Sequence, residues 1–141
     1  MGVRGLDHLA ITVDDIERTL AFYRRVLGAE PLFEDLWRAG KIPVVLLQVG
    51  ASRLSVHAAQ APAAPHARVP LPGSGDFCFR WDGPIEGAIA HLRERDVEIV
   101  LGPVPRPAAD GAAGQSVYFR DPDGNLLELL TTDASPGSPA R

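Results

Sequence analysis

The sequence predicts an α+β fold made of two βαβββ modules, which form a paired, half-open mixed sheet with the helices outside. Segments that alternate apolar and polar residues, as strands do, stand beside segments with helical spacing. The same order of segments occurs before and after a stretch rich in proline, alanine and glycine. We therefore expect one domain over residues 1–132, with module 1 over about 5–58, a linker over 59–75 and module 2 over about 76–131.

Module 1 opens with an alternating strand over residues 6–13, which places His8, Ala10 and Thr12 on one face. A helix follows, with Asp14 and Asp15 as its cap and Glu17 in capping-box position. Its apolar stripe consists of Ile16, Leu20, Tyr23 and Leu27, and Gly28 ends it. We expect three more strands, over residues 31–35, 43–49 and 53–57.

Module 2 repeats this order after the linker. A strand is expected over residues 76–81, and a helix opens at Asp82–Pro84 with proline in its first turn. A strand over 97–101, a loop over 103–114 and two strands over 116–119 and 126–130 follow. A tight turn at residues 121–125 joins the last pair. Residues 133–141 are rich in serine, proline and glycine, which predicts a disordered tail.

The two modules can be overlaid residue by residue. His8 matches Asp76 and Val13 matches Trp81 at the first strand of each module. Each module has one sheet face covered by its helix and one face left free. Two modules placed together would therefore enclose a cleft between their free faces.

Composition excludes several classes of protein. A net charge of −4 with scattered basic residues argues against a nucleic-acid surface, and no segment reaches the roughly 18 apolar residues of a membrane span. We expect no signal peptide, because the first residues lead into patterned sequence without an apolar segment, and the single cysteine suits a reducing compartment. We expect a cytoplasmic protein whose partner is a small molecule.

The free faces carry the side chains that can perform chemistry. His8 and His57 in module 1 and Asp76 and Glu128 in module 2 are all possible ligands of a divalent metal. Polar neighbours on the same faces are Thr12, Ser55, Arg80, Tyr118 and Arg120. Taken singly, each of these residues could be a polar surface residue without a chemical role. A histidine on a strand, for example, is usually a half-exposed polar residue. Glu128, centred in an apolar run, either reaches solvent or meets a cation.

Three motifs in this chain resemble the vicinal oxygen chelate superfamily, which includes glyoxalase I, extradiol dioxygenases, methylmalonyl-CoA epimerase and the fosfomycin- and bleomycin-resistance proteins. They are His8 within Leu6–Ile11, the helix end Phe22–Gly28, and the turn and strand Asp121–Glu128. The resemblance runs from about Leu6 to Thr131 and implies paired βαβββ modules, as the repeat does independently.

The resemblance implies a divalent metal, Fe2+, Mn2+, Ni2+ or Zn2+, with His8 and Glu128 at the ligand positions of the first and last strands. The family normally has a histidine at the start of the second module, where this chain has Asp76. Either Asp76 is a ligand or the third ligand comes from elsewhere. We favour His8, His57 and Glu128, with Asp76 as a fourth ligand or as an acceptor for an imidazole N–H.

The expected function is that of a metal-dependent enzyme with glyoxalase, lyase, isomerase or ring-cleaving dioxygenase chemistry on an oxygen-rich substrate. Glu128 would be a ligand or base and Tyr118 a hydrogen-bond donor, with substrate contacts from Arg80, Arg120, Thr12 and Ser55. The resemblance also implies a homodimer. The alternative is a metal-free binding protein of the bleomycin-resistance type, against which the presence of both His8 and Glu128 counts.

Overall fold

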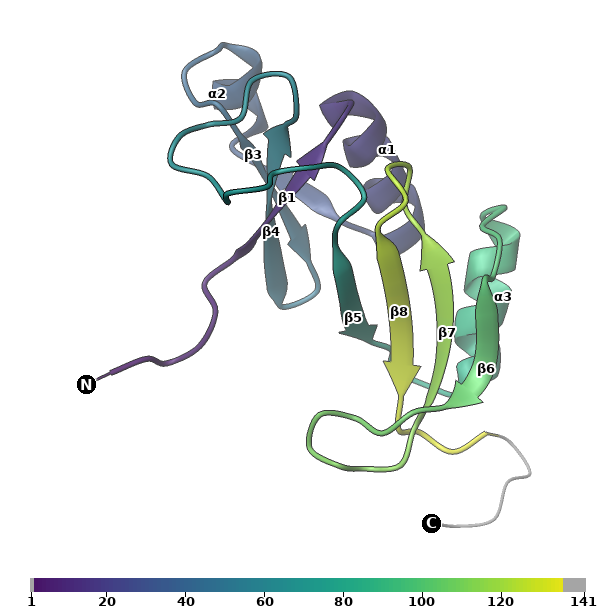
Figure 1. Cartoon of the computed structure of the whole chain (residues 1–141). Helices are drawn as coiled ribbons and strands as arrows, with labels where there is room; N and C mark the ends of the chain where they lie inside the picture. The colour runs from purple at the N-terminus through teal and green to yellow at the C-terminus, as the bar shows by residue number, and fades with distance from the viewer. Residues whose placement is uncertain (1, 136–141) are drawn as a thin grey trace. The chain divides into compact units, whose positions relative to one another are not determined.

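The chain divides into two compact units in a computed structural model that describes residues 2–135. Unit 1 is Met1–Gly75 and unit 2 is Asp76–Arg141, and each contains one four-stranded sheet (Figure 1). The boundary falls at the end of the expected linker.

Unit 1 contains four strands and two helices. In chain order they are β1 (Leu9–Val13), α1 (Ile16–Leu27), β2 (Glu30–Leu32), α2 (Glu34–Arg38), β3 (Val45–Val49) and β4 (Ser52–Ala58). The strands lie in the order β1-β4-β3-β2, with β1 parallel to β4 and the other pairs antiparallel. β1 is therefore an edge strand.

Unit 2 repeats this topology with one helix. Its elements are β5 (Asp76–Arg80), α3 (Ile85–Glu94), β6 (Leu101–Pro105), β7 (Gln115–Arg120) and β8 (Leu126–Thr131). The strand order is β5-β8-β7-β6, with β5 parallel to β8. The first and last strands of each unit thus pair side by side, and the α+β fold predicted from the repeat is confirmed.

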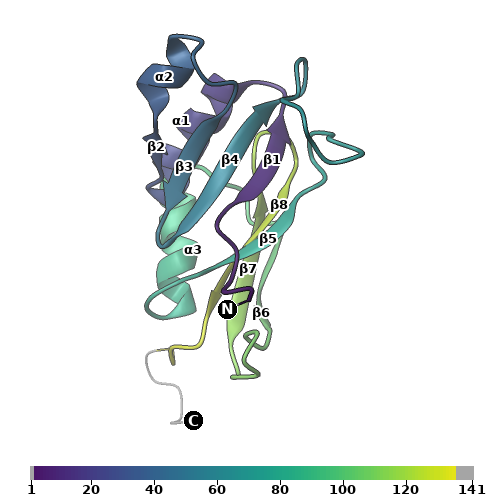
Figure 2. The same ribbon diagram turned by 90° about the vertical axis from the view of Figure 1, so that its left-hand side faces the viewer.

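The helix of each unit buries one face of its sheet. Figure 2 shows α1 on one side of the unit 1 sheet. Leu20 and Tyr23 of this helix are buried, as are Val13, Leu47 and Val56 of the sheet. The equivalent core of unit 2 consists of Ile85, Ala88 and Leu92 from α3 and Val117, Phe119, Leu127 and Leu129 from the sheet. Because side chains alternate along a strand, His57 and Glu128 lie on the faces without helices.

The first helix begins at one aspartate, without the predicted capping box. Asp15 is the N-cap, and its carboxylate accepts a hydrogen bond from the backbone N–H of Arg18 at 3.1 Å. Glu17 instead binds the guanidinium of Arg38. At the other end Gly28 adopts φ 64°, as predicted for a glycine after a helix.

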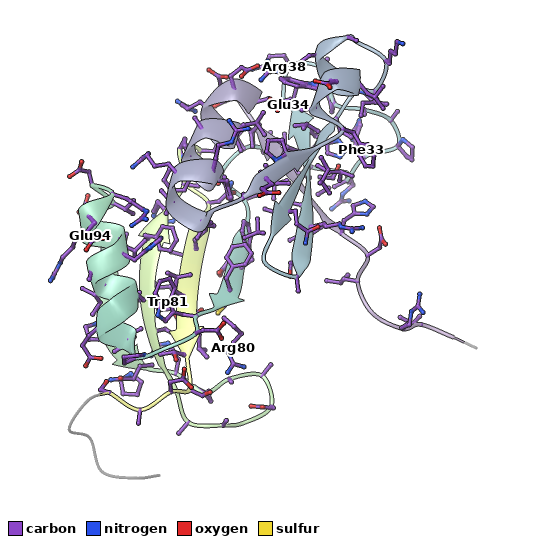
Figure 3. The ribbon with its side chains drawn as sticks, turned by 180° about the vertical axis from the view of Figure 1, so that it is seen from behind. Phe33, Glu34, Arg38, Arg80, Trp81 and Glu94 are labelled. Atoms are coloured by element: carbon purple, nitrogen blue, oxygen red, sulfur yellow. The ribbon has the colours of Figure 1, made fainter. Side chains whose placement is uncertain are left out.

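The strand predicted over residues 31–35 is too long, because its second half is helical. β2 ends at Leu32, and α2 follows with Phe33 at φ 60° before it. The helix is held by an ion pair between Glu34 and Arg38, 2.6 Å apart and one turn from each other (Figure 3). That spacing was the sequence signal for this short helix.

The strand predicted over residues 97–101 is displaced along the chain. Val97 still bonds back to the carbonyl of Leu92, and β6 runs over Leu101–Pro105. Pro103 argued for a loop, but β6 is an edge strand, where a residue without an N–H is tolerated. β6 consequently extends into the predicted loop.

The start of the predicted tail is held in place. The backbone N–H of Gly83 donates to the Asp133 carboxylate at 2.6 Å, which ties this residue to the start of α3. Residues 136–141 lie outside the described part of the chain. Within residues 2–135, none of the helices has the length and apolar character that a membrane span needs.

Candidate functional site

The helix-free face of each unit carries a pocket lined by residues predicted from the sequence. In unit 1 the cavity measures about 340 Å³ and is lined by His8, Ala10, Thr12 and His57 together with the segment that follows β4. That segment contributes His66, which the sequence gave no reason to include. Three imidazoles therefore face one cavity.

His57 is held by its strand neighbour. Its Nε2 and the Ser55 hydroxyl share a hydrogen bond of 3.1 Å, and Ser55 itself is only 3% exposed. Burial lowers the pKa of His57, and the charges of His8 and His66 lower it further. The neutral imidazole, which is the form that binds metals, is thus favoured.

His8 stands just before β1 and is about half exposed. Its Nδ1 lies 2.9 Å from a carboxylate oxygen of Asp7, and this hydrogen bond lowers the pKa of Asp7. A carboxylate on one imidazole nitrogen leaves the other nitrogen free to bind a cation. This is the arrangement that orients metal-binding histidines in proteins.

The pocket of unit 2 measures about 400 Å³ and combines acids, bases and apolar groups. It is lined by Asp76, Val100, Leu101, Arg106, Tyr118, Arg120, Leu126 and Glu128. β5 supplies Asp76, β7 supplies Tyr118 and Arg120, and β8 supplies Glu128. Four candidates from three strands thus meet on one surface.

Glu128 is oriented by the two strands that flank β8. The buried Ser116 hydroxyl donates to Oε2 of Glu128 at 2.5 Å, and Cys78 is its register partner on β5. Partial burial, followed by the Glu128 carboxylate, raises the pKa of the Cys78 thiol to about 12, so the thiol is protonated at neutral pH. Among the described residues Glu128 forms no ion pair with a protein cation.

Arg106 was missed because its segment was predicted to be a loop. Its guanidinium lies over the Tyr118 ring, 5.6 Å from the ring centre, and its Nε donates to the Tyr118 hydroxyl at 3.0 Å. The only sequence feature that could have pointed to Arg106 was a basic residue directly after Val104 and Pro105. Only the recognition of β6 would have placed it beside Tyr118.

Arg80 and Arg120 occupy different surroundings, although both lie on the same sheet. Arg120 lines the unit 2 pocket and donates to the carbonyl of Gly124 at 3.1 Å. Arg80, labelled in Figure 3, donates to the Thr132 hydroxyl at 2.9 Å and is absent from the lining. Neither unit gathers three or more His, Cys, Asp or Glu side chains into a metal-binding cluster among residues 2–135.

Two units with the same strand order, one with histidines and one with carboxylates on its helix-free face, are the features by which this chain can be compared with known protein families. The model of the glyoxalase/bleomycin resistance protein/dioxygenase superfamily matches residues 5–129. This chain belongs to that superfamily, which confirms the resemblance predicted from the sequence.

Two relatives show the same relationship over most of their length. Virulence protein STM3117 of Salmonella typhimurium is 38% identical over 88% of this chain and 81% of its own. Its crystal structure superposes with a TM-score of 0.83 over 94% of this chain, at 36% identity. Glyoxalase domain-containing protein RDO1 of Mycosarcoma maydis is 39% identical over 92% of this chain and 69% of its own.

A more distant neighbour shares the fold alone. The fosfomycin resistance protein FosX of Listeria monocytogenes, solved with Mn(II) and a dihydroxypropylphosphonic acid, is 19% identical with a TM-score of 0.59 over 91% of this chain and 90% of its own. The divalent metal and the small oxygen-rich molecule are those of the FosX structure itself.

Proposed function

We propose that this chain is a metal-dependent enzyme that acts on a small oxygen-rich substrate. The observation that supports the proposal most directly is the state of Glu128. Its carboxylate is oriented by Ser116 and half-buried in a pocket, yet it has no protein cation as partner among the described residues. A carboxylate kept in this state is ready to bind a metal ion.

The proposed ligands are His8, His57 and Glu128, with Asp76 as a fourth ligand or an acceptor for an imidazole. Two imidazoles and a carboxylate suit Fe2+, Mn2+, Ni2+ or Zn2+ and leave positions open for substrate oxygens. A metal bound there would act as a Lewis acid on vicinal oxygens. The neutral state of His57 and the Asp7 contact of His8 both favour this ligand set.

The remaining residues are proposed to orient the substrate and move its proton. Glu128 accepts a proton at its free carboxylate oxygen when it does not serve as a ligand. The Tyr118 hydroxyl accepts from Arg106 and can therefore donate its own proton to a substrate oxygen. Thr12 lines the unit 1 pocket, while Ser55 acts through His57.

We further propose a cytoplasmic homodimer.

Metal analysis of protein purified without chelator tests the proposal. We expect stoichiometric Fe, Mn, Ni or Zn in the wild type and its loss in His8→Ala and Glu128→Gln. His91→Ala is the matched control, because its ring packs on Trp81 outside both pockets. A wild type that holds no metal and gains no thermal stability from any of these ions would overturn the proposal.

A second comparison assigns the third ligand. His57→Ala should lose metal, whereas Asp76→Asn should retain part of it. If only the Asp76 variant loses metal, the assignment of His57 is wrong. If the wild type as purified holds no metal but still binds a small molecule, the binding-protein alternative is favoured instead.

A further inference from the structure

The unit 2 pocket contains a cationic half that the proposed metal chemistry does not use. Arg106 and Arg120 line it together with Tyr118, and neither guanidinium forms an ion pair among the described residues. Arginine carries five N–H donors in a planar fork that matches a carboxylate. Two such forks facing one cavity are a recognition element for an anion.

Arg106 is positioned before any ligand arrives. Its Nε donates to the Tyr118 hydroxyl at 3.0 Å, one terminal nitrogen donates to the carbonyl of Pro105 at 2.9 Å, and its guanidinium carbon lies 5.6 Å from the Tyr118 ring centre. These contacts use two of its donors and leave the others unused. Because the side chain is already ordered, binding an anion costs less conformational entropy.

The other half of the pocket is apolar. Val100 and Leu101 are 50% and 48% exposed, and Leu126 lines the same cavity. Exposed aliphatic side chains beside two guanidinium groups match a ligand with an apolar body and one anionic group. Asp76 and Glu128 also face the cavity and balance the two guanidinium charges, which disfavours a ligand with several negative charges.

We propose that this pocket binds a small organic acid, with its carboxylate on Arg106 and Arg120 and its apolar part on Val100, Leu101 and Leu126. The inference rests on the proposed function for the identification of this acid as the substrate. Its size follows from the cavity of about 400 Å³, which accommodates a molecule of roughly ten non-hydrogen atoms. Arg106 and Arg120 then determine specificity, and Tyr118 positions Arg106.

Calorimetric titration of the full chain with phenylacetate tests the pocket, with phenylacetamide and acetate as matched probes. Phenylacetamide removes the charge and acetate removes the apolar body. We expect phenylacetate to bind at least about tenfold more tightly than either probe. Arg106→Gln and Arg120→Gln should each weaken phenylacetate binding by about tenfold or more.

Arg93→Gln is the control, because Arg93 is an exposed arginine of the same unit that lies on α3 and does not line the pocket. It should bind phenylacetate as the wild type does. The inference would be overturned if phenylacetamide or acetate bound as tightly as phenylacetate, or if the Arg93 variant lost as much affinity as the Arg106 and Arg120 variants. The titrations are run in chelator, so their outcome is independent of the metal analysis that tests the proposed function.

Discussion

Ser116 is completely buried, and its hydroxyl contacts the carboxylate of Glu128. A buried donor fixes the orientation of a carboxylate without changing its charge. In metal sites such supporting groups contribute to affinity although they never touch the ion. Ser116 therefore connects the buried core of unit 2 to Glu128, the proposed metal ligand, and fixes the orientation of its carboxylate.

Replacing Ser116 by alanine should weaken metal binding about 10- to 100-fold, because the Glu128 carboxylate loses the donor that orients it. Titration of chelator-treated protein with Mn2+ measures the effect. Ser74→Ala serves as the control, since its hydroxyl donates to the carbonyl of Leu71 away from both pockets. An unchanged Mn2+ affinity in Ser116→Ala would show that Glu128 is oriented by other contacts.

The lowered pKa of His57 predicts a pH dependence of stability in the metal-free protein. Below about pH 6.5, the ordinary pKa of histidine, the unfolded chain takes up a proton that the folded chain still excludes. The stability that His57 contributes is complete above that pH and is lost as the pH falls through its folded-state pKa.

Urea unfolding at pH 8 and pH 5.5 in chelator tests this dependence. His57→Gln should lose less stability than the wild type between the two pH values, because it lacks the titrating group. The comparison at pH 8 measures the cost of the lost contacts alone. Parallel losses in both proteins would rule out His57 as a source of acid sensitivity.

At the scale of elements, β6 holds Arg106 against β7, and one glycine permits this contact. Gly102 has φ 119°, and a Cβ there would lie 2.6 Å from the carbonyl oxygen of Ser116. Both the backbone conformation and the close approach exclude a side chain. The position of Arg106 therefore depends on a residue outside the pocket.

Gly102→Ala should destabilise the protein by about 2 kcal/mol or more, because it combines backbone strain with a clash against backbone atoms. Gly111→Ala is the matched control, since Gly111 has φ 88° but nothing within 4 Å of an added Cβ. Strain alone should cost it about 1–2 kcal/mol. Urea unfolding of both variants decides whether the clash contributes, and equal losses would show that it does not.

The elements that sequence reasoning placed correctly are those with strong local signals. Alternation identified β1, β5 and β8, and the apolar stripe with its final glycine identified α1. β6 was misplaced because the tolerance for Pro103 depends on its being an edge strand, which is a property of the whole sheet. The helix at Glu34–Arg38 was missed because five residues carry too little periodicity.

The candidate site was predictable only in part. Strand alternation assigned His57, Tyr118 and Glu128 to faces, since a face follows from parity along the strand. Arg106 and His66 were missed because they come from segments without periodicity, whose course is decided by tertiary contacts. The separate surroundings of Arg80 and Arg120 likewise depend on contacts with Thr132 and Gly124.

At the scale of the whole molecule, the proposed histidine ligands belong to unit 1 and the carboxylates to unit 2. A repeated fold of this kind can combine its units within one chain or between the chains of a homodimer. The difference can be measured without knowing the substrate.

Mixed dimers of His8→Ala and Glu128→Gln chains, purified with two different tags, distinguish the two arrangements. If each ion is shared between chains, the mixed dimer has one intact site and one doubly damaged site, so half of the wild-type metal should return. If each ion is held within one chain, both sites are damaged and no metal returns. We expect the half-restored content, with each ion shared between the two chains of the proposed homodimer.

The edge position of β1 and β5 also bears on how the protein forms. Each pairs in parallel with a strand from the far end of its own unit, Leu9 with Leu54 and Asp76 with Leu126, and has a neighbour on one side only. Such pairs close long loops, so they form late and open readily. β5 begins with Asp76 and His8 directly precedes β1. An ion bound to either residue would therefore protect these edge strands from opening, and slower amide exchange in β1 and β5 would report its binding.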